Sequence, residues 1–349
     1  MDAEAASFGA EPDTAVRTGR FVEILRVAQR LVRVNTWVQP GESVVVLCDH
    51  EVSPMIVEAL AGQVYAADAT PVTVRMPPQD VHGSEPPAPV AAALDAADVI
   101  FAVVSKSVTH TRALQLAVEH GARYLGFSNI TEDAFIRGAA NCDPEILRDI
   151  GGRVRERLLD SSDIRVTSAA GTDVTFSLAG RRIMVADSIV PPAGDGPRTF
   201  ADGGRMFPDG EVYCCPLEDS VSGRIVIDRW MQGIGVLDEP IVWEMRDGHC
   251  VDISGGAQAA ALRRVIDDQG DEYSRRIGEF AIGINPKARP DGNPHREGKK
   301  LLGSCHFALG TGTVCGGIYQ SAIHLDGVLI PPKIEVDGAV LFDAGVLVG

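Results

Sequence analysis

The sequence predicts an α/β protein, with a doubly wound, mainly parallel sheet in an N-terminal domain and a β-rich (α+β) C-terminal domain. Up to about residue 160, short apolar segments alternate with segments of helical periodicity, as in a parallel sheet covered by helices. From residue 163 onward, apolar and polar residues alternate between Gly and Asp turns, as in antiparallel sheets. We therefore expect a loose tail at 1–18, an N-terminal domain at 19–160 and a C-terminal metal-binding domain at 161–349.

The first elements of the N-terminal domain have clear sequence signals. Apolar residues at helical spacing predict an amphipathic helix over residues 19–35, and a turn separates it from an apolar strand at 43–48. Ser53 followed by Pro54 is typical of a helix start, with the serine as N-cap and the proline in the first turn. This second helix is expected to end near residue 68.

Further strands and helices complete the predicted N-terminal domain. The strands are expected at 71–76, 99–104 and 123–127. A short helix precedes the second of these strands, and a helix capped by Thr109 follows it and ends near His120. A longer helix at 145–159, capped by Asp143, leaves the domain. No G-x-G-x-x-G or Walker pattern follows the first strand, so the sequence does not support a dinucleotide or ATP site.

Charge and cysteine content narrow the class of protein. The chain has 32 Lys and Arg against 48 Asp and Glu, a net charge of −16, which argues against nucleic acid or an anionic membrane as partner. It has no run of about 18 uncharged apolar residues, and its start lacks the features of a signal peptide. Seven scattered cysteines without C-x-x-C spacing fit reduced thiols in the cytosol. We therefore expect a cytoplasmic protein without a membrane span.

His110 is a candidate catalytic residue from the first half of the chain. It follows the carboxyl end of a predicted strand, where open α/β sheets place groups that contact ligands. A histidine at the start of a helix is more commonly a plain surface residue. Both interpretations stay open at the level of sequence.

Two segments near the C-terminus place metal-ligand residue types in predicted strands. His324 and Asp326 are two residues apart, so in a strand their side chains project from the same face. His306, in the glycine-bounded apolar segment 303–310, could supply a third ligand. Burying an imidazole and a carboxylate on an apolar strand costs free energy unless they have a partner. A divalent metal ion could be that partner.

Two glutamates add carboxylates to this set. Glu211 follows a turn at the start of an apolar strand, and Glu279 lies inside an apolar segment, where a glutamate is rarely buried alone. Either one by itself is best explained as an exposed acid at a strand end. Together with His306, His324 and Asp326 they indicate a shared site. Five ligands suit a pair of divalent ions about 3.5–4 Å apart, and these ligand types admit Zn, Mn, Co or Fe.

The same segments resemble the metal-ligand segments of the aminopeptidase T family of metallopeptidases, in the family's order. The similar stretches are residues 171–181, 208–212, 279–286, 303–310 and 324–327. The resemblance implies a two-domain protein, usually a homodimer, whose two-metal site removes amino-terminal residues from peptides. It also implies a ligand set with one bridging carboxylate: Glu211, Glu279, His306, His324 and Asp326.

The chain departs from this family at two places. Residues 299–302 read Lys-Lys-Leu-Leu where the family typically has a further glutamate, so one ligand of the second metal is missing. Residues 311–314 read Thr-Gly-Thr-Val where the family typically has a catalytic tyrosine, so a donor for the tetrahedral oxyanion is missing.

The chain also resembles the 2,5-dihydroxypyridine 5,6-dioxygenases. The resemblance implies the same fold with a single Fe(II), bound by a His/carboxylate triad that includes an H-x-D motif like the one from His324 to Asp326. The third ligand of that family is a histidine where this chain has Glu279. Glu279 favours a hydrolase-type ligand set, whereas the missing sixth ligand favours a single metal.

The first interpretation is a metal-dependent hydrolase that acts on a peptide or another small amide. One or two divalent ions would activate water, and Glu211 or Glu279 would accept its proton. The first alternative is a mononuclear non-haem Fe(II) dioxygenase that cleaves the ring of a hydroxylated pyridine or similar aromatic. The second is a non-catalytic dimeric relative with a structural metal.

Overall fold

The computed structural model describes residues 12–109, 111–192, 199–290 and 297–348. Contacts divide the chain into two compact units. The first consists of Met1–Ile136 with Val190–Arg205, and the second of Arg137–Ile189 with Met206–Gly349. No helix in the described residues combines the length and the hydropathy needed to cross a membrane.

The first unit is built on a five-stranded sheet with the order β2-β1-β3-β4-β8. Its strands are β1 (Ser43–Cys48), β2 (Thr70–Arg75), β3 (Val99–Val103), β4 (Arg123–Gly126) and β8 (Gly204–Met206). The pairings of β1 with β2, β1 with β3 and β3 with β4 are parallel, which confirms the predicted doubly wound, mainly parallel sheet.

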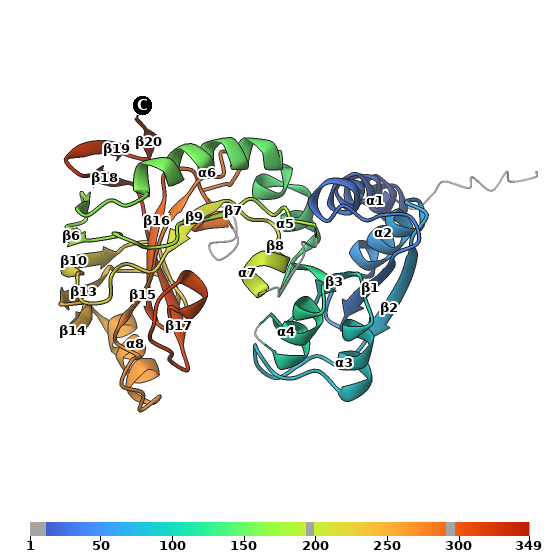
Figure 1. The fold of residues 1–349 in the computed structure, drawn as a ribbon, viewed down its shortest axis with the longest axis horizontal. Helices are drawn as coiled ribbons and strands as arrows, with labels where there is room; N and C mark the ends of the chain where they lie inside the picture. The colour runs from blue at the N-terminus through green and yellow to red at the C-terminus, as the bar shows by residue number, and fades with distance from the viewer. Residues whose placement is uncertain (1–11, 110, 193–198, 291–296, 349) are drawn as a thin grey trace, which may run out of the picture. The chain divides into compact units, whose positions relative to one another are not determined.

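Helices lie on both sides of this sheet. They are α1 (Pro12–Arg30), α2 (Pro54–Tyr65), α3 (Ala88–Asp95), α4 (Arg112–Glu119), α5 (Glu132–Ile136) and α7 (Phe200–Gly203). Figure 1 shows α1 and α2 on one side of the sheet and α3 and α4 on the other. Strands β1 and β3 are almost completely buried between them, which explains their continuous apolar sequences.

Local capping in this unit agrees with the prediction at one helix and differs at another. The Ser53 hydroxyl accepts a hydrogen bond from the Met55 amide, as expected of an N-cap. Thr111, and not Thr109, caps α4, because the Thr109 hydroxyl is hydrogen-bonded to the Tyr124 hydroxyl at 3.0 Å instead. The predicted tail is also too long, since α1 already begins at Pro12. A single internal residue, Gly19, costs a helix only about 1 kcal/mol and does not stop it.

The second unit contains two antiparallel sheets, as predicted for the C-terminal half. One has the order β14-β13-β10-β6-β5-β18-β19-β20 and the other the order β12-β11-β17-β16-β15-β9-β7. The strands of the first are β5 (Ile164–Ser168), β6 (Asp173–Phe176), β10 (Ser222–Ile227), β13 (Ile241–Arg246), β14 (His249–Ser254), β18 (Pro332–Val336), β19 (Ala339–Asp343) and β20 (Val346–Leu347). Those of the second are β7 (Met184–Ala186), β9 (Glu211–Cys214), β11 (Trp230–Met231), β12 (Gly235–Val236), β15 (Ile277–Gly283), β16 (Cys305–Gly310) and β17 (His324–Leu329).

Aromatic side chains join the two sheets. The ring centroid of Phe176 on β6 lies 4.7 Å from that of Phe280 on β15 and 5.8 Å from that of Phe307 on β16. These rings belong to one buried apolar cluster that includes residues of both sheets. One face of the β15–β16 pair therefore packs in the core. The residues that alternate with Phe280 and Phe307 along these strands project from the opposite face.

Helix α6 (Pro144–Leu158) belongs to the second unit, although the sequence prediction placed it at the end of the first domain. The reason is its apolar face, where Leu147, Val154 and Leu158 join the core of the second unit. Gly151 allows the close approach, because a Cβ there would lie 2.4 Å from Val185 Cγ1 on β7. Figure 1 shows α6 and α8 (Ala257–Asp267) at opposite ends of this unit. The described residues 190–192 and 199–205, by contrast, were predicted to lie in the C-terminal domain but belong to the first unit.

Candidate metal centre

Four neighbouring strands of the second sheet carry all the predicted ligands from the C-terminal half. The strands lie in the order β17-β16-β15-β9. Ala308 in the middle is paired with both Glu279 on β15 and Asp326 on β17. Its small side chain leaves room between the two carboxylates. The structure thus brings together Glu211, Glu279, His306, His324 and Asp326; their role as ligands stays a prediction.

A β-bulge turns Glu279 to this face. The register of β15 against β16 shifts between Ile277 and Glu279, leaving Gly278 as the extra residue. In a regular strand Ile277 and Glu279 would share a face. The bulge allows Ile277 to join the apolar core while Glu279 faces the imidazoles.

Distances within the cluster are those of groups able to share one ion. His324 Nε2 lies 2.8 Å from Glu279 Oε2 and 3.1 Å from Asp326 Oδ1. His306 Nε2 lies 3.6 Å from Glu279 Oε1 and 3.8 Å from Glu211 Oε2. One ligand atom each from Glu279, His306 and Asp326 lies within 4.8 Å of the others.

Several polar atoms of the cluster are buried without a hydrogen bond. The side chain of His306 is 0% exposed, yet neither of its ring nitrogens makes one. Glu211 Oε2 and Asp326 Oδ1 are in the same situation. Because buried polar atoms normally have partners, atoms of this kind that face one another are suited to bind a cation. The residues present therefore fit a divalent metal ion.

The second imidazole is oriented for metal binding. His324 Nδ1 lies 2.8 Å from the carbonyl oxygen of Thr311, which can only accept, so Nδ1 carries the proton and Nε2 faces the carboxylates. Burial lowers the pKa of His324, but the carboxylates of Asp326 and Glu279 beside its Nε2 raise it more, to well above its usual value. In the metal-free protein a proton on Nε2 thus takes the position of a metal ion.

The same interactions keep the carboxylates ionised. Burial raises the pKa of Glu279, but the neighbouring imidazoles of His306 and His324 lower that pKa more, to well below its usual range. Asp326 shows the same net direction, with the positive charge of Lys299 as the largest lowering cause. Both acids are therefore anionic at neutral pH, as the predicted ligand role requires.

Two lysines belong to the site, and sequence reasoning noticed them only as departures from the aminopeptidase T pattern. Lys299 Nζ lies 2.7 Å from Asp326 Oδ2. Lys300 Nζ lies 2.6 Å from Asp209 Oδ1 and also contacts Glu211 Oε1. Asp209 was likewise not predicted as a site residue; its only sequence signal is its place next to the Glu211 motif.

A family model for the 2,5-dihydroxypyridine 5,6-dioxygenases (NicX) matches residues 25–349. The match includes every residue of the cluster and nearly the whole chain. The chain belongs to the 2,5-dihydroxypyridine 5,6-dioxygenase family. No curated protein matches it in sequence.

Two solved structures share the fold over nearly the whole chain. The 2,5-dihydroxypyridine dioxygenase from Pseudomonas putida KT2440 is 20% identical, with a TM-score of 0.76 over 94% of this chain and 97% of that one. Aminopeptidase T (AmpT) from Thermus thermophilus is 17% identical, with a TM-score of 0.69 over 94% of this chain and 99% of that one. Both resemblances found in the sequence are thereby confirmed. At these identities the structures show the fold alone.

Membership of the dioxygenase family changes the order of the functional interpretations. An enzyme that uses a divalent metal is supported by the family and by the cluster. The family match favours the dioxygenase, which the sequence analysis placed second, over the hydrolase, which it placed first. His110, the remaining predicted catalytic residue, lies outside the described residues.

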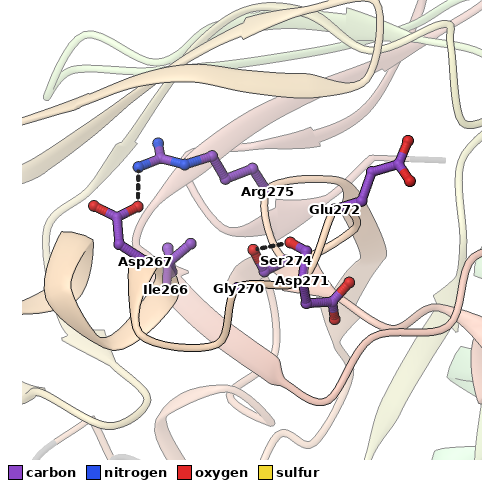
Figure 2. Close-up of a pocket in the computed structure, with 7 residues that line it drawn as sticks. All are labelled: Ile266, Asp267, Gly270, Asp271, Glu272, Ser274 and Arg275. Atoms are coloured by element: carbon purple, nitrogen blue, oxygen red, sulfur yellow. Dashed lines mark hydrogen bonds and ion pairs between the residues drawn. The ribbon is translucent and has the colours of Figure 1, made fainter.

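This member of the dioxygenase family also has a surface hollow, which is separate from the metal centre. It is formed where α8 ends and the following turn begins (Figure 2). Its lining residues are Ile266, Asp267, Gly270, Asp271, Glu272, Ser274 and Arg275, and none of them belongs to the cluster. Arg275 and Asp267 form an ion pair of 2.7 Å there, so the positive charge of Arg275 offsets part of the negative charge of the acidic residues that line the hollow.

Proposed function

We propose that this protein is a mononuclear non-haem Fe(II) dioxygenase that opens the ring of a small hydroxylated aromatic compound, such as a dihydroxypyridine. One observation supports this most directly: two imidazoles, His306 and His324, meet the carboxylates of Glu279 and Asp326 in a buried cluster. Two histidines with a carboxylate are the ligand set typical of non-haem iron oxygenases. Family membership supports the same reaction class.

His306, His324, Asp326 and Glu279 would hold the ion. A bound Fe(II) would supply the one-electron chemistry that couples dioxygen to an electron-rich ring. The carbonyl of Thr311 fixes the ring of His324 so that its Nε2 faces the site. Burial of Glu279, His306 and Asp326 limits their contact with solvent, which strengthens each electrostatic contact among them.

Glu211 is the proposed proton acceptor for a ring hydroxyl. Its Oε1 is engaged by Lys300, whereas its Oε2 is buried without a hydrogen bond beside His306. A carboxylate with one oxygen bound to a lysine and the other without a hydrogen bond can accept a proton from a substrate that lies beside the free oxygen. Glu211 is thereby assigned to proton transfer and not to the metal, which departs from the ligand set implied by aminopeptidase T.

Oxygen consumption tests the proposal. Protein loaded anaerobically with Fe(II) should consume about one O₂ per molecule of 2,5-dihydroxypyridine or a related dihydroxylated ring, and the ring absorbance should disappear in step. Replacing Glu211 by Gln should lower kcat by about 10²-fold or more with iron content unchanged. A panel of such rings that leaves the oxygen level unchanged in iron-loaded protein would rule the proposal out.

A metal-dependent hydrolase is the second candidate. It is favoured by the acidic character of the cluster, in which two glutamates, Glu211 and Glu279, flank one imidazole, His306. The AmpT fold is compatible with it. Release of the anilide from aminoacyl anilides by Zn- or Co-loaded protein, without any oxygen consumption, would establish this candidate in place of the dioxygenase.

A further inference from the structure

Lys299 and Lys300 are two consecutive lysines that are largely buried. Only 15% of the side chain of Lys299 and 7% of that of Lys300 are exposed. Lysine is among the residues least often buried without a partner. The backbone fixes their place: the Lys300 amide donates to the carbonyl of Glu297 at 2.9 Å, and its carbonyl accepts from the amide of Asn285 at 2.8 Å.

Each lysine binds one oxygen of a carboxylate and leaves the other oxygen for the metal centre. Lys299 contacts Oδ2 of Asp326, and Lys300 contacts Oε1 of Glu211. The second oxygens face the imidazoles: Asp326 Oδ1 lies 3.1 Å from His324 Nε2, and Glu211 Oε2, buried without a hydrogen bond, lies 3.8 Å from His306 Nε2. Lys300 also pairs with Asp209, so that one ammonium group bridges two carboxylates. A bridging position of this kind is one that a second divalent ion takes in two-metal sites.

The net charge of the cluster also suits a single divalent ion. Three carboxylates, those of Asp209, Glu211 and Asp326, contact the two lysine ammonium groups. A fourth, that of Glu279, contacts His324. Once a metal ion has displaced the extra proton of His324, the four carboxylates exceed the two lysines by two negative charges, which one divalent ion neutralises. A second divalent ion would lie next to the ammonium groups in a buried site, where like charges repel strongly.

We propose that Lys299 and Lys300 take the place of a second metal ion and hold the centre to one divalent ion. They act as positioning residues, since each leaves a single oxygen of its carboxylate free to face the cluster. This inference rests on the metal site of the proposed function but not on the reaction, because it concerns only how many ions bind.

Metal stoichiometry tests this inference. Metal-free protein would be titrated with Mn²⁺, and the bound ions counted by mass spectrometry and by the EPR spectrum, in which two neighbouring Mn²⁺ ions give a spin-coupled signal. The wild type should bind about one ion per chain, and Lys300→Met about two with the coupled signal. Lys299→Met should also gain a second ion, because it frees Oδ2 of Asp326.

Three controls make the result specific. Lys333→Met, at a half-buried lysine outside the cluster that pairs with Glu335 at 2.9 Å, should keep one ion. Lys300→Arg keeps the charge and should keep one ion. The double variant Lys300→Met with Asp209→Asn removes one charge of each sign and should return to one ion.

Circular dichroism would show which variants are folded. Two ions in the wild type, or one ion in folded Lys299→Met and Lys300→Met, would overturn the inference. Where Lys300→Met fails to fold even with Mn²⁺, Lys299→Met and the wild-type count decide. Absence of oxygen consumption with the predicted ion counts would sink the proposed reaction and leave this inference standing.

Discussion

At the scale of single residues, the centre depends on pairs whose two members come from different strands. His324 is held by a backbone carbonyl on one side and faces two carboxylates on the other. Neither ring nitrogen of His306 makes a hydrogen bond to the described residues, although the side chain is completely buried. Both observations concern individual nitrogen atoms, so substitution and titration of single side chains are the appropriate tests.

Replacing His324 or Asp326 by alanine should lower the affinity for Fe(II) or Mn²⁺ by about 100-fold or more, since each removes a ligand from a buried site. The fold of the first unit should be retained, because neither residue belongs to it. Bound metal per chain and the circular dichroism spectrum are the measurements. His120→Ala, at an exposed histidine paired with Asp95, is the control and should bind metal normally. Stoichiometric metal in either ligand variant would contradict the assignment.

Metal affinity should fall with decreasing pH. The metal-free protein carries a proton on His324, whose pKa is raised well above its usual value, and a metal ion must displace that proton. Below this raised pKa, the metal Kd should rise by about tenfold per pH unit. Calorimetry in buffers of different ionisation enthalpy should show about one proton released per ion. A Kd that is constant between about pH 6 and 8 would refute this coupling.

The raised pKa of His324 also makes the stability of the metal-free protein depend on pH. Because the folded pKa of His324 is raised, its contribution to stability is fully present below the unfolded value of about 6.5. That contribution is lost as the pH rises through the folded pKa. Metal binding replaces the proton and makes the stability at high pH depend on the ion.

At the scale of elements, the bulge in β15 decides which face Glu279 occupies. Gly278 fits there because a Cβ would lie 2.7 Å from the carbonyl oxygen of Thr311. The same carbonyl accepts the hydrogen bond of His324 Nδ1. One glycine therefore connects the direction of Glu279 with the orientation of His324.

Gly278→Ala should destabilise the protein by about 1–3 kcal/mol, because backbone has to move to admit the methyl group. It should also weaken metal binding by at least about tenfold, since Glu279 and the carbonyl of Thr311 shift together. Gly152→Ala is the matched control: it lies in α6 with nothing within 4 Å of the new Cβ, so it should stabilise the protein by up to about 1 kcal/mol. Urea unfolding and metal titration of both variants measure these effects. Equal effects of the two substitutions would contradict the role of the bulge.

At the scale of the whole molecule, each of the two units has its own buried residues, and the candidate metal centre lies entirely in the second. The seven cysteines are all free and buried. Burial raises the pKa of Cys215 and of Cys250 to about 12, and that of Cys305 well above its usual value. The thiols are therefore protonated small hydrophobic groups, as expected for structural cysteines. The expected homodimer stays a prediction.

Native protein should show no rapidly reacting thiol toward Ellman's reagent at about pH 8, because no cysteine is both exposed and ionised. After unfolding in guanidinium chloride without reductant, all seven cysteines of the sequence should react. Fewer than seven after unfolding would reveal a disulfide, and a fast-reacting thiol in the native protein would contradict the burial described here.

The sequence by itself determined the alternation of strands and helices, the change to antiparallel sheet near residue 163, and the residue types that meet at the centre. These are visible because periodicity reports which face of an element is buried. Only the tertiary structure decided that α6 joins the second unit, that a bulge turns Glu279, and that Lys299 and Lys300 bind the carboxylates. Such features depend on strand register and on partners far apart in the chain, and no local pattern of residues specifies them.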